Sequence, residues 1–146
     1  MSIQRTQLII HRFDTQHALW PECRLIRKRV FIEEQHVSVA LEWDASDGAA
    51  MHFLAMVGGQ SVACARVLDD GHIGRMAVLP EWRGQGIGEA LLLQAIQECQ
   101  HLEVSYARLS AQTHAIEFYE RAGFEVCSAP YLDADIMHVD MQLELV

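Results

Sequence analysis

The chain has 146 residues, of which 51% are hydrophobic and 21% are charged, as expected for one globular domain rather than a disordered segment. Its 20 acidic and 11 basic side chains give a net charge of -9, which disfavours binding to nucleic acid or to an anionic membrane surface. An acidic surface most often keeps a protein soluble, and it would also suit a cationic or amine-bearing substrate.

The first part of the chain predicts a strand and a long helix. Residues 7–13 (QLIIHRF) are short, apolar and rich in β-forming side chains, which predicts a strand. Asp14 or Thr15 would cap a helix that runs to about Gln35. Alternatively, the helix begins at Pro21, because proline is favoured in the first helical turn.

A series of strands follows an irregular segment. Residues 36–50 (HVSVALEWDASDGAA) contain turn-forming Asp, Ser and Gly, which predicts an irregular connection. Gly58-Gly59-Gln60 marks a hairpin turn between two apolar segments, and Pro80 ends the strand that comes after them. The expected strands span residues 51–57, 61–68 and 73–79.

The second half of the chain alternates helices with strands. A helix over residues 86–101 presents an apolar stripe, and residues 107–111 alternate as a strand. A short helix follows, with Thr113 as its N-cap and Gly123 as its stop. Residues 137–145 alternate strictly between apolar and polar, which predicts a half-buried strand. The resulting order, β-α-β-β-β-α-β-α-β, predicts an α/β domain (α+β type) whose mixed sheet is largely antiparallel with one parallel step.

Residues 83–88 (RGQGIG) place three glycines directly before a helix. They do not form a Walker A loop, because the chain contains no Lys-Ser or Lys-Thr pair. They do not form a dinucleotide fingerprint either, because G-x-G-x-G is one residue short of G-x-G-x-x-G. A glycine-rich turn into a helix still offers N–H groups to an anion, and Arg83 adds a positive charge. The residues alone leave two alternatives, a pyrophosphate site and an ordinary loop.

The surroundings of this segment resemble a known family. Residues 73–92 (IGRMAVLPEWRGQGIGEALL) resemble motif A of the GNAT superfamily of acetyl-CoA-dependent N-acyltransferases. Arg83, Gly86 and Gly88 match the Arg/Gln-x-x-Gly-x-Gly/Ala positions of that motif. Residues 115–124 (AIEFYERAGF) resemble motif B of the same family. Three further segments are similar to the ElaA-like branch, namely residues 29–35 (RVFIEEQ), 44–53 (DASDGAAMHF) and 135–138 (DIMH).

The resemblance covers nearly the whole chain and implies a fold and an activity. It implies one GNAT domain over residues 1–146, with the sheet splayed at the cofactor site and helices on both faces. The implied activity is that of an acyltransferase, which moves an acetyl group from acetyl-CoA directly to a primary amine of a small molecule or peptide. The alternative is a non-catalytic acyl-CoA-binding regulatory module that keeps the cofactor site without turnover. An intact Tyr119 favours the enzyme.

The resemblance also implies which residues hold acetyl-CoA. The strand before the glycines holds the pantetheine arm, and the Val78 N–H is the expected oxyanion donor. The N–H groups of residues 83–88 would hold the pyrophosphate. Gln112 stands where many members carry an asparagine that contacts the cofactor. The implied cofactor-binding residues are Met76, Ala77, Val78, Arg83, Gly84, Gln85, Gly86, Ile87, Gly88, Gln112 and Tyr119.

Direct transfer needs an acid and a base. Tyr119 is the expected acid toward the CoA sulfur, because a phenol with an ordinary pKa of about 10 keeps its proton at neutral pH. Without motif B around it, Tyr119 would be interpreted as a core aromatic residue. Glu34 and His52 are the expected groups that take the proton of the amine, directly or through a water molecule. Glu33 and His138 are the other candidates.

Three further expectations concern metals, location and assembly. No metal site is expected, because the chain has neither H-E-x-x-H nor a Cys-His cluster with zinc spacing. No signal peptide and no membrane span are expected, and the four scattered cysteines predict free thiols in a reducing cytoplasm. The alternating C-terminal strand could supply the edge of a homodimer.

Overall fold

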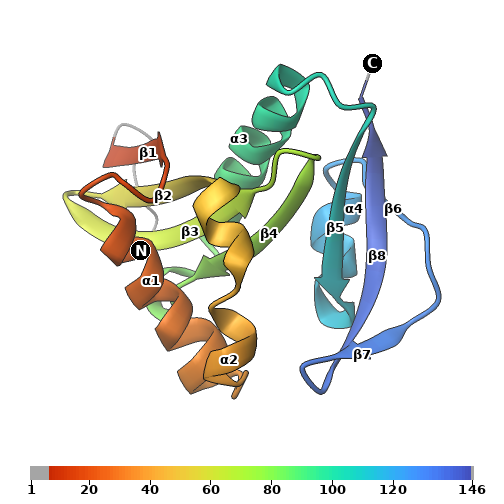
Figure 1. The fold of residues 1–146 in the computed structure, drawn as a ribbon, viewed down its shortest axis with the longest axis horizontal. Helices are drawn as coiled ribbons and strands as arrows, with labels where there is room; N and C mark the ends of the chain where they lie inside the picture. The colour runs from red at the N-terminus through yellow and green to blue at the C-terminus, as the bar shows by residue number, and fades with distance from the viewer. Residues whose placement is uncertain (1–6, 146) are drawn as a thin grey trace.

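A computed structural model describes residues 7–145, which form a curved sheet with helices on both faces (Figure 1). The strands are β1 (Leu8–Phe13), β2 (Met51–Val57), β3 (Gln60–Val67), β4 (His72–Val78), β5 (Tyr106–Gln112), β6 (Glu125–Val126), β7 (Tyr131–Asp133) and β8 (Ile136–Glu144). The helices are α1 (Trp20–Arg27), α2 (Val39–Glu42), α3 (Ile87–His101) and α4 (Ile116–Glu120). A π-helical segment, η2 (Lys28–Glu34), continues α1, and the 3-10 turns are η3 (Ala45–Ala49), η4 (Pro80–Trp82) and η5 (Thr113–Ala115). Over residues 7–145, no helix has both the length and the hydropathy needed to cross a bilayer.

The strands lie in the order β1-β2-β3-β4-β5-β8-β6, and β7 also pairs with β8. Every neighbouring pair is antiparallel except β4 and β5, which are parallel. The mixed, mostly antiparallel sheet with one parallel step that the sequence predicts is therefore confirmed. The parallel step needs a crossover connection, and α3 provides it.

The sheet splits at its parallel step. β4 and β5 pair only through His72 with Arg108 and Ile73 with Leu109, and the two strands then diverge (Figure 1). Beyond this point, β4 contains an extra residue relative to β3, because its register shifts between Gly74 and Ala77. Such a bulge bends its strand and ends regular pairing. The divergence opens a space between the two halves of the sheet.

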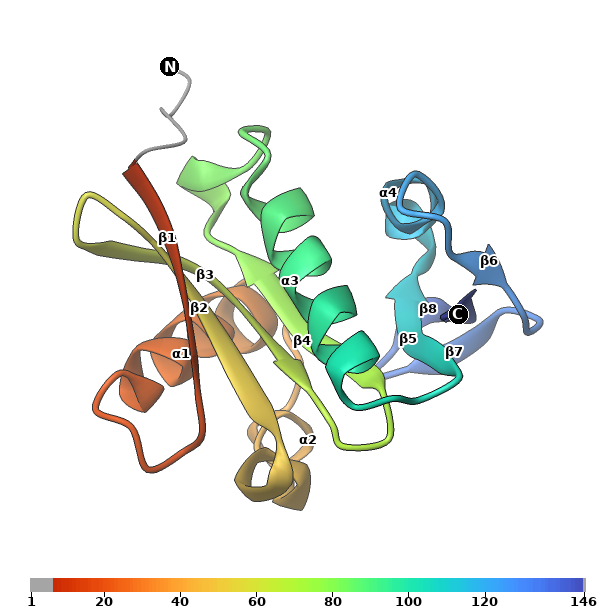
Figure 2. The same cartoon turned by 90° about the horizontal axis from the view of Figure 1, so that it is seen from above.

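Two hydrophobic layers attach the helices to the sheet, one on each face. Phe53 and Leu54 are neighbours on β2, and they point to opposite faces because side chains alternate along a strand. Phe53 belongs to the cluster beneath α3, whose buried helical members are Ile87, Leu91, Leu92, Ala95, Ile96 and Cys99. Leu54 belongs to the cluster beneath α1 and η2, whose buried helical members are Cys23, Ile26 and Val30. The view in Figure 2 shows α1 and α3 on the two sides of the strands.

Most predicted elements are confirmed, and two predicted helix starts need comment. Helix α1 begins at Trp20 with Pro21 in its first turn, which is the second of the two alternatives. The Asp14 carboxylate accepts a hydrogen bond from the Gln16 N–H in a turn before that helix. The prediction of Thr113 as an N-cap is wrong, because Thr113 lies inside η5 and no side chain caps η5 or α4.

Sequence periodicity misses two short strands. β6 has two residues and β7 has three, so neither is long enough to show an alternating pattern. Both pair with β8 on the side away from β5, for example Glu125 with Gln142 and Tyr131 with His138. β8 is therefore an internal strand, and the prediction that it supplies a dimer edge is wrong.

Candidate active site

A cleft of about 960 Å³ lies where β4 and β5 separate, and residues from both faces of the sheet line it. On the α3 face, the lining comes from the start of α3, from the loop before it, and from Phe118 and Tyr119 of α4. We call this end the α3-side opening. On the other face, the lining comes from η2, α2 and the turn between β7 and β8, and we call this end the α2-side opening. The cleft thus connects the two faces through the split in the sheet.

The glycine-rich loop forms one wall of the α3-side opening. Gly84 and Gly86 have φ values of 77° and 83°, a left-handed conformation that glycine adopts without strain. Within the described residues, the N–H groups from Gly84 to Glu89 have no hydrogen-bond acceptor, whereas the Arg83 N–H donates to Pro80 O. The free run is therefore one residue later than the predicted 83–88. Six unpaired N–H groups at a helix start form a site for an anion.

The space around this loop is open. A Cβ atom on Gly84 or Gly86 would meet no atom within 4 Å, so a ligand can approach the backbone there. A Cβ on Gly88 would lie 3.5 Å from Phe118 and 3.6 Å from Val78, so the third glycine allows close packing of α3 against both residues. The Oε1 of Gln85 is buried without a donor among residues 7–145, and Gln85, unlike the glycines on either side of it, does not line the cleft.

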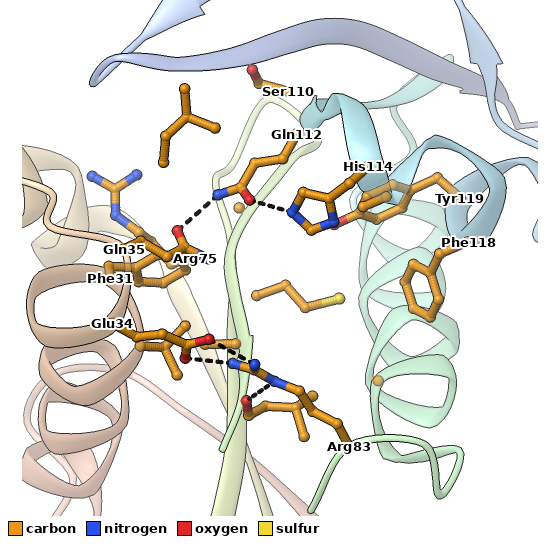
Figure 3. A pocket seen from close by; sticks show the side chains of 18 of the residues that line it. Phe31, Glu34, Gln35, Arg75, Arg83, Ser110, Gln112, His114, Phe118 and Tyr119 are labelled. Carbon is orange, nitrogen blue, oxygen red and sulfur yellow. Dashed lines mark hydrogen bonds and ion pairs between the residues drawn. The ribbon is translucent and has the colours of Figure 1, made fainter. Parts of the chain in front are cut away.

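Arg83 does not point its charge into the open space beside the loop. Its Nε donates to Val78 O at 2.9 Å, and its two terminal nitrogens donate to the Glu34 carboxylate at 2.7 and 2.8 Å (Figure 3). This bidentate pair lowers the pKa of Glu34. Arg83 and Glu34 therefore link the glycine loop to the end of η2 across the cleft.

The end of β4 presents free backbone groups to the cleft. The Leu79 N–H donates to Val62 O, so Leu79 faces β3. Because backbone groups alternate along a strand, the N–H and C=O of Val78 face the gap left by β5. The bond from Arg83 Nε to Val78 O is consistent with this orientation. Met76, Ala77 and Val78 all line the cleft.

Tyr119 lies across the cleft from this strand. Its ring contacts Phe118 and Phe124 edge-on, at centroid distances of 5.0 and 6.1 Å. Tyr119 lines the cleft, and its hydroxyl makes no hydrogen bond within the described chain (Figure 3). Burial raises the pKa of Tyr119 to about 12, so the hydroxyl remains a proton donor at neutral pH.

Gln112 spans the split between the two halves of the sheet. Its Nε2 donates to Gln35 Oε1 at 2.8 Å, and its Oε1 accepts from His114 Nε2 at 2.7 Å (Figure 3). Gln35 follows η2 and His114 belongs to η5, so this chain of side chains joins opposite walls of the cleft. The Gln112 amide is thus at the expected place, with protein partners on both of its polar atoms.

The two predicted bases lie in different places. Glu34 lines the cleft, but Arg83 already holds its carboxylate. His52 does not line the cleft. Its buried ring contacts Trp20 at a centroid distance of 4.2 Å, its Nε2 lies 3.0 Å from Asp47 O, and burial lowers its pKa. Within residues 7–145, no group of three His, Cys, Asp or Glu side chains could hold a metal ion.

A buried ionic network beside His52 was not predicted. It joins three arginines to three carboxylates and fastens α2 and η3 to β3, β4 and α1. Its members are Arg27, Arg66, Arg75, Glu42, Asp44 and Asp47. Arg75 is the residue at the β4 bulge and has a φ of 50°. Two of the carboxylates, Asp44 and Asp47, lie in residues 44–53, the segment that is similar to the ElaA-like branch. That similarity was the one sequence feature that could have pointed to the network.

The split sheet, the free N–H groups at the start of α3 and the phenol facing them define an acyltransferase fold. A scan against known families matches residues 12–145 to the acetyltransferase (GNAT) domain. The chain belongs to the GNAT acetyltransferase family.

Individual relatives agree with this family. A UPF0039 protein of Schizosaccharomyces pombe is 37% identical over 129 residues, covering 83% of this chain and 85% of its own. The protein ElaA of Escherichia coli is 30% identical over 129 residues, covering 83% of this chain and 84% of its own. The resemblance to the ElaA-like branch is therefore confirmed.

Solved structures match the fold over nearly the whole chain. An acyl-CoA N-acyltransferase from Pseudomonas aeruginosa has a TM-score of 0.82 and 32% identity, covering 93% of this chain and 99% of its own. A GNAT family acetyltransferase from Elizabethkingia anophelis with acetyl-CoA bound has a TM-score of 0.72 and 16% identity, covering 97% of this chain and 100% of its own. The latter likeness concerns the fold alone.

Proposed function

We propose that the protein is an N-acetyltransferase that moves an acetyl group from acetyl-CoA directly to a primary amine of a small molecule or peptide. One observation carries this proposal. An anion site of unpaired N–H groups, the free backbone edge at Val78 and the unpaired hydroxyl of Tyr119 line a single cleft that opens on both faces of the sheet. Two substrates can therefore meet inside it from opposite sides.

In the proposed complex, the acetyl-CoA pyrophosphate binds the N–H groups from Gly84 to Glu89, where the dipole of α3 favours negative charge. The pantetheine arm binds the free edge of β4 along Met76, Ala77 and Val78. The acetyl-CoA bound to the fold relative from Elizabethkingia anophelis supports the choice of cosubstrate. The absence of a side chain at Gly84 and Gly86 leaves room for both groups.

The chemistry follows from groups that already face the cleft. Attack of the amine on the thioester carbon places negative charge on the carbonyl oxygen, and the Val78 N–H is oriented to donate to it. The C–S bond then breaks, and Tyr119 donates its proton to the departing sulfur. Its raised pKa keeps that proton in place until the thiolate forms.

The principal test measures thiol release from acetyl-CoA in the presence of a panel of primary amines, together with the Kd of acetyl-CoA. Thiol release that depends on the amine supports the enzyme. Tight binding of acetyl-CoA without release by any amine supports the alternative, a non-catalytic acyl-CoA-binding regulatory module. Replacing acetyl-CoA with longer acyl-CoA esters then establishes whether the transferred group is acetyl.

Two remaining parts of the proposal concern the cellular location and the oligomeric state of the protein. We place it in the cytoplasm, and its four free cysteines, three of them buried, agree with a reducing compartment. A homodimer stays a prediction, and sedimentation of the purified protein tests it.

A further inference from the structure

The α2-side opening of the cleft has an apolar wall with almost every charge neutralised. Its apolar lining consists of Phe31, Val37, Leu41 and Ile136. Glu34 is paired with Arg83, and Glu42 is paired with two arginines of the buried network. Asp133, next to the turn between β7 and β8, is the exception, because its carboxylate has no ion pair with any residue in 7–145. Such a surface accepts an apolar body and attracts a cationic group.

Of the predicted bases and the histidines of this cleft, one histidine is best placed to take a proton from an amine. Glu34 is a weak base, because Arg83 stabilises its carboxylate and lowers its pKa. His52 lies outside the cleft. His114 is exposed, and because its Nε2 donates to the amide oxygen of Gln112, only its solvent-facing Nδ1 could take a proton. Only His138 combines burial, a place in the cleft lining and a free ring nitrogen.

The tautomer of His138 is fixed by its own strand. Its Nδ1 lies 2.7 Å from Ile136 O, and because a carbonyl oxygen only accepts, Nδ1 carries the proton in the neutral ring. Nε2 then has a lone pair, and within the described chain it has no partner. A neutral imidazole held in this way is suited to accept a proton at Nε2.

Two carboxylates lie on the strands around His138. On β7, the Tyr131 ring stacks on the imidazole at a centroid distance of 6.1 Å, and Asp133 lies two residues further on. On β8, Asp140 is two residues away on the same face and accepts a hydrogen bond from the Tyr131 hydroxyl. On β5, the residue opposite His138 is the uncharged Gln112. At the two strand positions paired with His138 there is thus no basic side chain.

We propose that the α2-side opening receives a primary amine with an apolar body, and that Nε2 of His138 takes the proton that makes the amine nucleophilic. This inference rests on the proposed function. It replaces Glu34 and His52 with His138 as the group that takes the proton. It also names the class of amine that receives the acetyl group.

The protons and electron pairs balance in this scheme. His138 Nε2 removes one proton from the ammonium group and passes it to solvent, which frees the nitrogen lone pair. The C–N bond forms and the C–S bond breaks, with its electron pair leaving on sulfur. The tetrahedral nitrogen loses a second proton to the medium, and Tyr119 supplies one proton to sulfur and recovers one from the medium.

The first experiment compares His138→Gln with His101→Gln, a matched change at an exposed position near the end of α3. We expect His138→Gln to lower kcat/KM at least about 100-fold, the usual contribution of a general base, with no change in the Kd of acetyl-CoA. We expect the wild type and His101→Gln to lose kcat/KM as the pH is lowered, because a general base must be unprotonated to act, and we expect His138→Gln to lack this acid limb. Wild-type turnover in His138→Gln, or an unchanged acid limb, would overturn the assignment.

The second experiment tests the class of acceptor with a matched pair, phenethylamine and phenylalanine, which differ by one carboxylate. We expect kcat/KM to be at least about tenfold higher for phenethylamine, because the carboxylate would face an apolar wall and Asp133 without a counter-ion. Equal or faster turnover of phenylalanine would overturn the apolar acceptor. Wild-type protein that binds acetyl-CoA and releases no thiol with any amine would overturn the proposed function itself, which is a different outcome from either of these.

Discussion

Arg83 and Glu34 form a bidentate ion pair, with N–O distances of 2.7 and 2.8 Å, across the cleft between the glycine loop and η2. The most conspicuous positive charge beside the anion site is therefore already neutralised by the protein. Replacing Glu34 with Gln should release Arg83 toward a bound pyrophosphate. We expect the Kd of acetyl-CoA to fall by up to about fivefold, the range of a partly exposed pair, as measured by calorimetry. Weaker binding in Glu34→Gln would contradict this view, and Arg83→Gln serves as the comparison.

The glycine loop gives a second prediction. Gly86→Asp should abolish detectable binding of acetyl-CoA, because it places a carboxylate next to the free N–H groups. Gly58→Asp is the matched control, since Gly58 also has a positive φ and open space around it but lies in the hairpin between β2 and β3. Both variants place an aspartate at a positive φ, of 57° in one and 83° in the other, so melting temperatures measured beside the Kd values separate binding from folding. Unchanged affinity in Gly86→Asp would remove the anion site from the proposal.

Tyr119 gives a prediction on pH as well as on rate. Tyr119→Phe should lower kcat by about 100-fold while the Kd of acetyl-CoA stays the same, because only the proton donor is lost. The control is Tyr106→Phe, a tyrosine at the start of β5 outside the cleft lining. With a pKa of about 12 rather than 10, the Tyr119 phenol stays protonated in the alkaline range. We therefore expect no loss of kcat between about pH 8 and 10, where a phenol of ordinary pKa would begin to lose its proton.

The ionic network gives a prediction on stability. The Arg66 guanidinium lowers the pKa of Asp44 to about 2 from its usual 3.8. Because the folded pKa is depressed, the network stabilises the protein above the usual value and loses that contribution as the pH falls toward 2. Asp44→Asn should lower the free energy of unfolding at pH 7 by about 1 to 2 kcal/mol. Urea titrations should show this difference shrinking as the pH is lowered, and a constant difference would speak against the ion pair as its source.

The fold was largely predictable because its long elements have strong periodicity. The residues of β8 alternate from Met137 onward, and α3 repeats apolar side chains over fifteen residues, so both follow from the sequence. β6 and β7 do not, because two or three residues carry no period. The switch of η2 to π-helical geometry is also not encoded in any local pattern that we can identify.

The site was predictable where a motif fixes the backbone and unpredictable where contacts are long-range. Tyr119 and the glycines follow from motifs A and B, and the structure brings them into one cleft. Glu34 also lines that cleft. Its ion pair with Arg83 joins residues 49 positions apart in the sequence, so no local pattern predicts it. His52 and His138 both lie on predicted strands, and only the three-dimensional order of those strands separates them.

The short parallel contact between β4 and β5 has a mechanical consequence. With backbone pairing limited to two positions and to the Arg108 N–H bond to Gly71 O at the same end, β5 and β8 are joined to the rest of the sheet by the apolar layer beneath α3 and, across the open end, by the Gln35–Gln112 hydrogen bond. Widening the cleft therefore breaks one neutral amide contact rather than a ladder of strand bonds. We therefore expect the width of the cleft to change more readily than the register of any strand.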